Sequence, residues 1–255
     1  MDIFSANLNR GAMAEVEAGS RGPGVADIYE RLVALDDYEP GPTVSTLFEY
    51  LVDRVLYGEG AVDLDPGQRR ELRAIAATAE YRLERHWADR IVAAADPVAT
   101  LAEFPYVENY RTLARLEHGG VVGVDKTRPM DAVFVGGGPL PLSAIVLARD
   151  HDWPVTVIDR DPDAVASARR ITDALGVDVA VREVDGSICD YGGHDVVHVA
   201  ALAGSDGGGS DEDGVYDRIA TTADDGTGGP LSGLTATSLR SWRYSADRGL
   251  RWRRG

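Results

Sequence analysis

Three groups of residues in the second half of the sequence have the types and spacing needed to hold a nucleoside. The stretch Gly136-Gly137-Gly138-Pro139-Leu140 follows an apolar run, and glycines between a strand and a helix let backbone N–H groups approach a ligand. Asp159 follows the next apolar run, where an acidic residue can bind both hydroxyls of a ribose. Asp185 follows the third and could accept a hydrogen bond from an exocyclic amine such as that of adenine.

This order of a glycine turn and two acids fits S-adenosylmethionine better than a dinucleotide. In the dinucleotide fingerprint the third glycine packs the helix against the strand, and Pro141 stands in that position here. The alternative is that the glycines only make a tight turn and that the acids belong to an acidic surface.

The elements expected around these residues alternate between strand and helix. The apolar runs predict a βαβ unit continued by two more strands, hence a parallel, doubly wound, Rossmann-like sheet. The expected strands cover residues 131–135, 155–158, 179–181 and 196–202, and the expected helices are a stretch after the glycines through 147 and a second helix over 163–175.

The first half has helical periodicity throughout. Asp65-Pro66 is expected to open a long helix, because aspartate caps helices and proline fits the first turn. A shorter helix over 98–116 should be interrupted at Pro105 and closed by Gly119-Gly120. The expected organisation is an unstructured segment 1–24, a helical domain 25–120, an S-adenosylmethionine-binding domain 121–227 and a basic tail 228–255.

Composition narrows the classes of partner. The 255 residues carry a net charge of −16, which repels nucleic acid and anionic membranes and favours small solutes. A single cysteine and scattered histidines give no metal-binding pattern. Lys126 is the only lysine among 26 basic residues, which is typical of a salt-adapted cytoplasm. No apolar run has signal-peptide or membrane-spanning length, so a cytoplasmic location is expected.

The glycine turn also carries a resemblance to a known family. The stretch 133–148, with its Gly-Gly-Gly-Pro-Leu-Pro-Leu-Ser core, resembles the signature of the nicotianamine synthases, and the archaeal type in particular. The stretches 40–52, 79–86, 104–110, 161–164 and 195–204 resemble further family blocks in the same order. The resemblance implies a helical bundle followed by the sheet of a class I S-adenosylmethionine-dependent transferase.

The activity that this resemblance implies is transfer of a 3-amino-3-carboxypropyl group from S-adenosylmethionine to an amine. Methylthioadenosine would leave, and repeated transfer would make a nicotianamine-like metal chelator. S-adenosylmethionine is then a substrate, and no cofactor or metal is implied. Alternatives are a methyltransferase on the same sheet and a degenerate protein that binds S-adenosylmethionine without turnover. The acceptor and the oligomeric state stay open, a homodimer being one option.

The incoming amine must lose a proton, so a general base is needed near the acceptor. Glu80 lies at the margin of the apolar stripe of its helix, where partial burial would raise its pKa, while Glu84 is expected further toward solvent. Together with the family match, this assigns Glu80 as the base and Tyr106 as its hydrogen-bonding partner. Asn109 and Tyr110 are assigned to substrate binding. The alternatives are a boundary glutamate paired with arginine, and aromatic packing at a helix break.

The pattern of the family breaks after residue 227. The stretch 229–255 holds six arginines and one acid, a net charge of +5, and Gly228-Gly229-Pro230 is a poor start for a strand. We expect the sheet to lack its last strands and the activity to be impaired. A shifted reading frame is the simplest account of this tail, and a nucleic-acid or membrane arm is the alternative.

Overall fold

The computed structural model describes residues 22–57, 63–125 and 131–200, together with residues 215, 218, 219, 221 and 222. The expectations for 1–21 and for the basic tail 228–255 lie outside the described residues. The segment just before the first helix is held by Arg54, whose guanidinium donates hydrogen bonds to the carbonyls of Gly22 and Pro23.

The first half is helical, as the sequence predicts. Asp65 caps the longest helix by accepting from the backbone N–H groups of Gly67 and Gln68 at 2.7 and 2.9 Å. The expected interruption near Pro105 is also present. The helices are α1 Val25–Val33, α2 Pro42–Tyr57, α3 Pro66–Ala93, α4 Pro97–Ala102 and α5 Val107–Asp125.

The expected helix end at Gly119-Gly120 is wrong, because α5 continues to Asp125. Glycine inside a helix costs about 1 kcal/mol relative to alanine but does not remove a backbone hydrogen bond. The packing of α5 against α6 (Leu142–His151) stabilises the helix up to this point. There, His118 of α5 stacks on His151 and accepts a hydrogen bond from the Trp153 indole at 2.9 Å.

The second half is a parallel four-stranded sheet with the strand order β3-β2-β1-β4. The expected βαβ unit and Rossmann-like topology are confirmed. The strands are β1 Ala132–Val135, β2 Val155–Asp159, β3 Val179–Glu183 and β4 Val196–Val199, and α7 spans Pro162–Leu175. Residues 201 and 202, the expected end of the last strand, lie outside the described residues.

The two faces of the sheet are both covered. Ala132 and Phe134 of β1 face a core shared with α3, α5, α6 and α7, whereas Val133 and Val135 face a second core. This division follows from the two-residue period of a strand. The second core is covered by Tyr191 and by the described residues between 215 and 222, which are helical.

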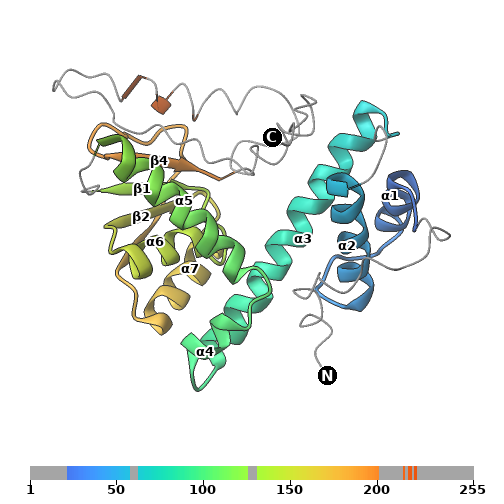
Figure 1. Cartoon of the computed structure of the whole chain (residues 1–255), viewed down its shortest axis with the longest axis horizontal. Helices are drawn as coiled ribbons and strands as arrows, with labels where there is room; N and C mark the ends of the chain where they lie inside the picture. Colours follow the sequence, from blue (N-terminus) through green and yellow to red (C-terminus); the bar gives the residue numbers. More distant parts are fainter. Residues whose placement is uncertain are drawn as a thin grey trace, which may run out of the picture.

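Helix α3 belongs to both halves of the molecule. Figure 1 shows it running between the α1–α2 pair and the sheet. Near its start, Ile75 packs with Ile28 and Leu47 in a small helical core. Near its end, Trp87 and Ile91 pack in the core of the sheet. This helix therefore sets the position of the helical half relative to the carboxyl ends of the strands.

His198 of β4 is a buried histidine without a polar partner. Its side chain is 2% exposed and stacks on Phe134 of the neighbouring strand, with ring centroids 4.3 Å apart. Neither ring nitrogen has a hydrogen-bond partner among the residues that the structure describes. Burial lowers the pKa of His198 to about 4, because the charged imidazolium would lose its hydration.

This burial predicts an acid-labile sheet. Between pH 7 and pH 5 the unfolded chain takes up a proton on this histidine and the folded chain does not, so stability falls as the pH falls. In chemical denaturation, the free energy of unfolding of the wild type should drop by about 2 kcal/mol more over this range than that of His198→Phe. Substitution of the exposed His86 by Phe is the matched control. An equal drop in wild type and His198→Phe would contradict this account.

Candidate nucleoside and acceptor site

The turn between β1 and α6 requires glycine for two reasons, a left-handed backbone conformation and a close approach to the neighbouring strand. Gly136 and Gly138 have φ angles of 76° and 67°, in the region that favours glycine. A Cβ on Gly137 would lie 2.2 Å from Cγ1 of the buried Val157, so the backbone here packs directly on β2. Pro139 and Leu140 complete the turn and are buried. The sequence-predicted turn is therefore a close-packed loop at the carboxyl end of the sheet.

Asp159 ends β2 and lies beside this turn. Its Oδ2 accepts from the backbone N–H of Gly138 and its Oδ1 accepts from the backbone N–H of Asp161, both at 2.9 Å. Each carboxylate oxygen can accept a second hydrogen bond. The carboxylate is thus fixed in orientation and keeps lone pairs for the two hydroxyls of a ribose.

Asp185 lies in the loop after β3 and is exposed. The Ser187 N–H and hydroxyl donate to its Oδ1 at 2.8 and 2.7 Å, and these bonds hold the pKa of Asp185 below its usual range. The turn that follows is fixed by Gly186, whose Cβ would lie 2.6 Å from Val135 Cγ1, and whose carbonyl accepts from the Tyr191 hydroxyl. The acid stays ionised, which suits an acceptor of an amine N–H.

Glu84 of α3 reaches the glycine turn, in contrast to the expected position toward solvent. A Cβ on Gly138 would lie 2.6 Å from Glu84 Oε2, and the backbone N–H of Leu140 donates to the Glu84 carboxyl. Burial raises the pKa of Glu84 well above its usual range, and the charge of Glu80 raises it further. Glu80 therefore lies close to Glu84, and burial together with this like charge favours the protonated form of Glu84.

The two tyrosines of the acceptor assignment lie near this pair. Burial and then the charges of Glu84 and Glu80 raise the pKa of Tyr110, which is half-buried. Burial and then the charges of Glu49 and Glu80 raise the pKa of Tyr106, whose side chain is 44% exposed. Both phenols therefore stay protonated at neutral pH and can donate hydrogen bonds.

Asn109 is exposed on α5, and its role stays a prediction.

Sequence reasoning missed Glu84, Ser187 and Gly186. Glu84 follows Glu80 by four residues and so lies near it on the helix surface, a signal that was available. The sequence did not reveal that the glycine turn covers this part of α3.

Among the residues that the structure describes, no group of three or more histidine, cysteine or carboxylate side chains is arranged to hold a metal ion. None of the described helices combines the length and the apolar character needed to cross a bilayer.

The fold defines an α/β protein of the Rossmann-like class with an added helical half. Comparison with known proteins makes the assignment specific. Residues 23–241 match the family described as nicotianamine synthase protein. The chain belongs to the nicotianamine synthase family.

The relatives also show how much of the family protein this chain represents. Nicotianamine synthase 2 of Oryza sativa subsp. indica is 34% identical over 194 residues, which cover 71% of this chain and 60% of that protein. Nicotianamine synthase 9 of Hordeum vulgare is 36% identical over 184 residues, covering 67% and 54%. The chain thus spans only part of the length of the curated relatives that it matches.

Among solved structures, MtNAS in complex with MTA and tNA is 25% identical to this chain and has a TM-score of 0.66. The match covers 78% of this chain and 76% of that one. A Glu-to-Gln mutant of MtNAS in complex with S-adenosylmethionine has the same identity and a TM-score of 0.64.

The contact between Gly137 and Val157 generates a stability prediction. Gly137→Ala should lower the free energy of unfolding by about 1–3 kcal/mol, because the added methyl group overlaps a side chain in a close-packed core. Val157→Ala should remove most of this penalty when the two changes are combined. A double-mutant cycle measured by denaturant unfolding tests the coupling.

The matched control is Gly193→Ala, because a Cβ on Gly193 meets no atom within 4 Å. Additive effects of Gly137→Ala and Val157→Ala would show that the turn does not pack on β2 as described.

Proposed function

We propose that this chain transfers the 3-amino-3-carboxypropyl group of S-adenosylmethionine to an amine acceptor and so makes a nicotianamine-like chelator. The observation that carries the proposal is the place of the α3 carboxylates. Glu84 contacts the glycine turn of the nucleoside site, and Glu80 lies close enough to raise its pKa. This arrangement supports the proposal that Glu80 serves as the base for the acceptor beside the nucleoside site.

The proposed nucleoside site consists of Gly136, Gly137, Gly138, Pro139, Leu140, Asp159 and Asp185. Asp159 would hold the ribose and Asp185 the adenine amine, at the carboxyl ends of neighbouring strands where open α/β sheets bind ligands. The related MtNAS structures in complex with S-adenosylmethionine, and with MTA and tNA, support the proposal that this fold holds such ligands. MTA corresponds to the nucleoside that the proposed reaction releases.

In the proposed step the amine nitrogen attacks the carbon of the aminocarboxypropyl chain that is bonded to sulfur. The C–S bond breaks, its electron pair goes to sulfur, and neutral methylthioadenosine leaves. Glu80 takes the proton of the amine. Burial and the neighbouring charge of Glu80 favour a proton on Glu84. Glu80 is then the member of the pair left ionised to act as the base.

The acceptor side of the site would be formed by α5. Tyr106 would donate a hydrogen bond near the base, and Tyr110 and Asn109 would bind the acceptor. The effect of the Glu80 charge on both phenols supports their place beside the base. The aminocarboxypropyl group and an amino acid acceptor each carry a carboxylate, and protonated phenols suit such oxygen acceptors.

Two other activities would use the same nucleoside site. A methyltransferase would pass on a different carbon of the sulfonium, and a degenerate protein would bind S-adenosylmethionine without turnover. The carboxylate pair at the turn favours a transferase with an amine acceptor, because a protein that only binds needs no base there. We further propose a cytoplasmic protein of the archaeal type, with a homodimer as one option. The single lysine among 26 basic residues supports adaptation to salt.

Replacing the proposed base separates catalysis from binding. Glu80→Gln should retain S-adenosylmethionine affinity within about twofold and lose about 10² to 10⁴ in the rate of methylthioadenosine release. Affinity is measured by calorimetry and release by chromatography. Glu30→Gln, an exposed change on α1, is the matched control. A wild-type rate in Glu80→Gln would remove Glu80 from the base role.

A further inference from the structure

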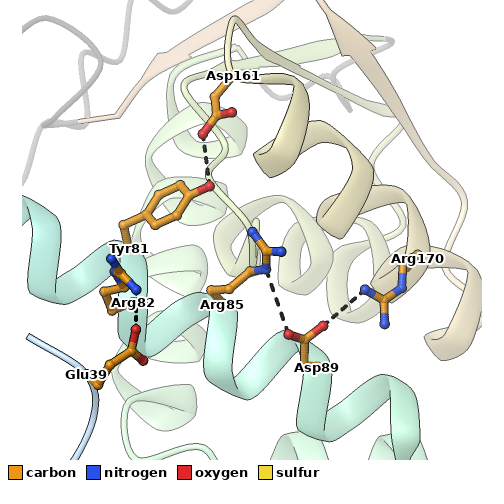
Figure 2. A network of polar contacts seen from close by, with 7 residues as sticks. All are labelled: Glu39, Tyr81, Arg82, Arg85, Asp89, Asp161 and Arg170. Carbon is orange, nitrogen blue, oxygen red and sulfur yellow. Dashed lines mark hydrogen bonds and ion pairs between the residues drawn. The ribbon is translucent and has the colours of Figure 1, made fainter.

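Helix α3 makes a second contact with the nucleoside site, on the side of the ribose acid. The Tyr81 hydroxyl donates to Asp161 Oδ2 at 2.9 Å across 80 residues of sequence. Figure 2 shows this contact next to the ion pair Asp89–Arg170, which joins α3 to α7, and the ion pair Arg85–Asp89 within α3. Unlike these ion pairs, the Tyr81 contact reaches the loop that holds Asp159, because its partner Asp161 belongs to that loop.

Asp161 is fixed at three points. Its Oδ2 accepts from Tyr81, its Oδ1 accepts from the backbone N–H of Asp163 at the start of α7, and its own N–H donates to Asp159 Oδ1. A continuous chain of hydrogen bonds therefore runs from the Tyr81 phenol through Asp161 to Asp159. The orientation of the Asp159 carboxylate depends on where this loop is held.

We infer that Tyr81 is a positioning residue for the ribose-binding carboxylate. It touches no substrate; it acts through Asp161, whose backbone N–H sets the direction of the Asp159 carboxylate. This inference rests on the proposed function, because it takes Asp159 as the ribose acceptor. Tyr81 stands next to Glu80 in α3, so the helix that supplies the proposed base also holds the loop of the nucleoside site.

The chemistry of Tyr81 suits this role. Burial and the hydrogen bond to Asp161 raise the pKa of Tyr81, so the phenol keeps its proton and remains a donor at neutral pH. Tyr81 also borders a surface hollow of about 490 Å³ together with Arg82 and Arg85. Because the ring is only half-buried, removal of its hydroxyl should leave the fold intact.

The chain offers a matched control for this hydroxyl. The Tyr29 hydroxyl donates to Glu71 Oε2 of α3 at 2.6 Å, so it also joins a phenol to a carboxylate. Tyr29 lies on α1 in the helical half, away from the strand ends. Tyr29→Phe therefore removes the same chemical contact without touching the ribose loop.

The test is calorimetric binding of S-adenosylmethionine and of methylthioadenosine to the full chain. We expect Tyr81→Phe to weaken both about five- to tenfold, and Tyr29→Phe to change them less than twofold. Asp159→Ala, which removes the proposed ribose acceptor itself, should weaken binding at least tenfold. In turnover, Tyr81→Phe should raise the KM for S-adenosylmethionine and leave kcat within about twofold, a split that a general loss of stability would not produce.

A second variant tests the path through Asp161. Asparagine also caps helices, so Asp161→Asn keeps the start of α7 while it removes the charged acceptor of Tyr81. The double variant Tyr81→Phe/Asp161→Asn should bind S-adenosylmethionine no more weakly than whichever single variant has the lower affinity, because the two side chains act as one unit. Equal affinities of Tyr81→Phe and Tyr29→Phe, or fully additive losses in the double variant, would overturn the inference while the proposed function stands. A wild type that binds neither nucleoside would overturn both.

Discussion

The arrangement of the site depends on the winding of one row of buried and partly buried side chains around α3. Ile75, Ala79, Leu83, Trp87 and Ile91 follow one another at a spacing of four residues, and all five contribute to packing. Because four residues exceed one helical turn, each step moves the row by about 40° around the axis, or roughly 160° over its length. One end of α3 therefore faces α1 and α2, and the other faces the sheet.

The positions between these two ends carry the polar groups. Where the row passes from one core to the other, Tyr81 and Glu84 meet the carboxyl ends of the strands. Glu84 reaches the glycine turn and Tyr81 reaches Asp161. Two carboxylates placed this close to a buried turn are costly to keep ionised together. Burial and the charge of Glu80 raise the pKa of Glu84, so that Glu84 can take up a proton and relieve the repulsion, which leaves Glu80 as the proposed base.

The sequence alone predicts an element correctly where a single local rule decides its structure. The Asp65-Pro66 start of α3, the break near Pro105 and the alternation around Gly136–Gly138 follow from capping, from proline chemistry and from strand period, and all three are present. The sequence alone does not predict an element's bounds where a tertiary contact decides them. Gly119-Gly120 does not end α5, because the helix packs on α6 there.

Glu84 is the more instructive case. A single apolar stripe places Glu84 toward solvent, but the stripe of α3 winds, and the glycine turn covers the surface where Glu84 lies. The partners of Asp159 illustrate the same limit. Its spacing from the glycine turn predicted a ribose acid, whereas the hydrogen bonds through Asp161 to Tyr81 join segments 80 residues apart, which no local pattern encodes.

The identity of the nucleoside released from S-adenosylmethionine tests the central claim most directly. The full chain would be incubated with S-adenosylmethionine and a panel of amino acid acceptors, and the products identified by mass spectrometry. The account predicts methylthioadenosine, together with an acceptor enlarged by a 3-amino-3-carboxypropyl group. Release of S-adenosylhomocysteine with a methylated acceptor would contradict it, and so would tight binding of S-adenosylmethionine with no product at all.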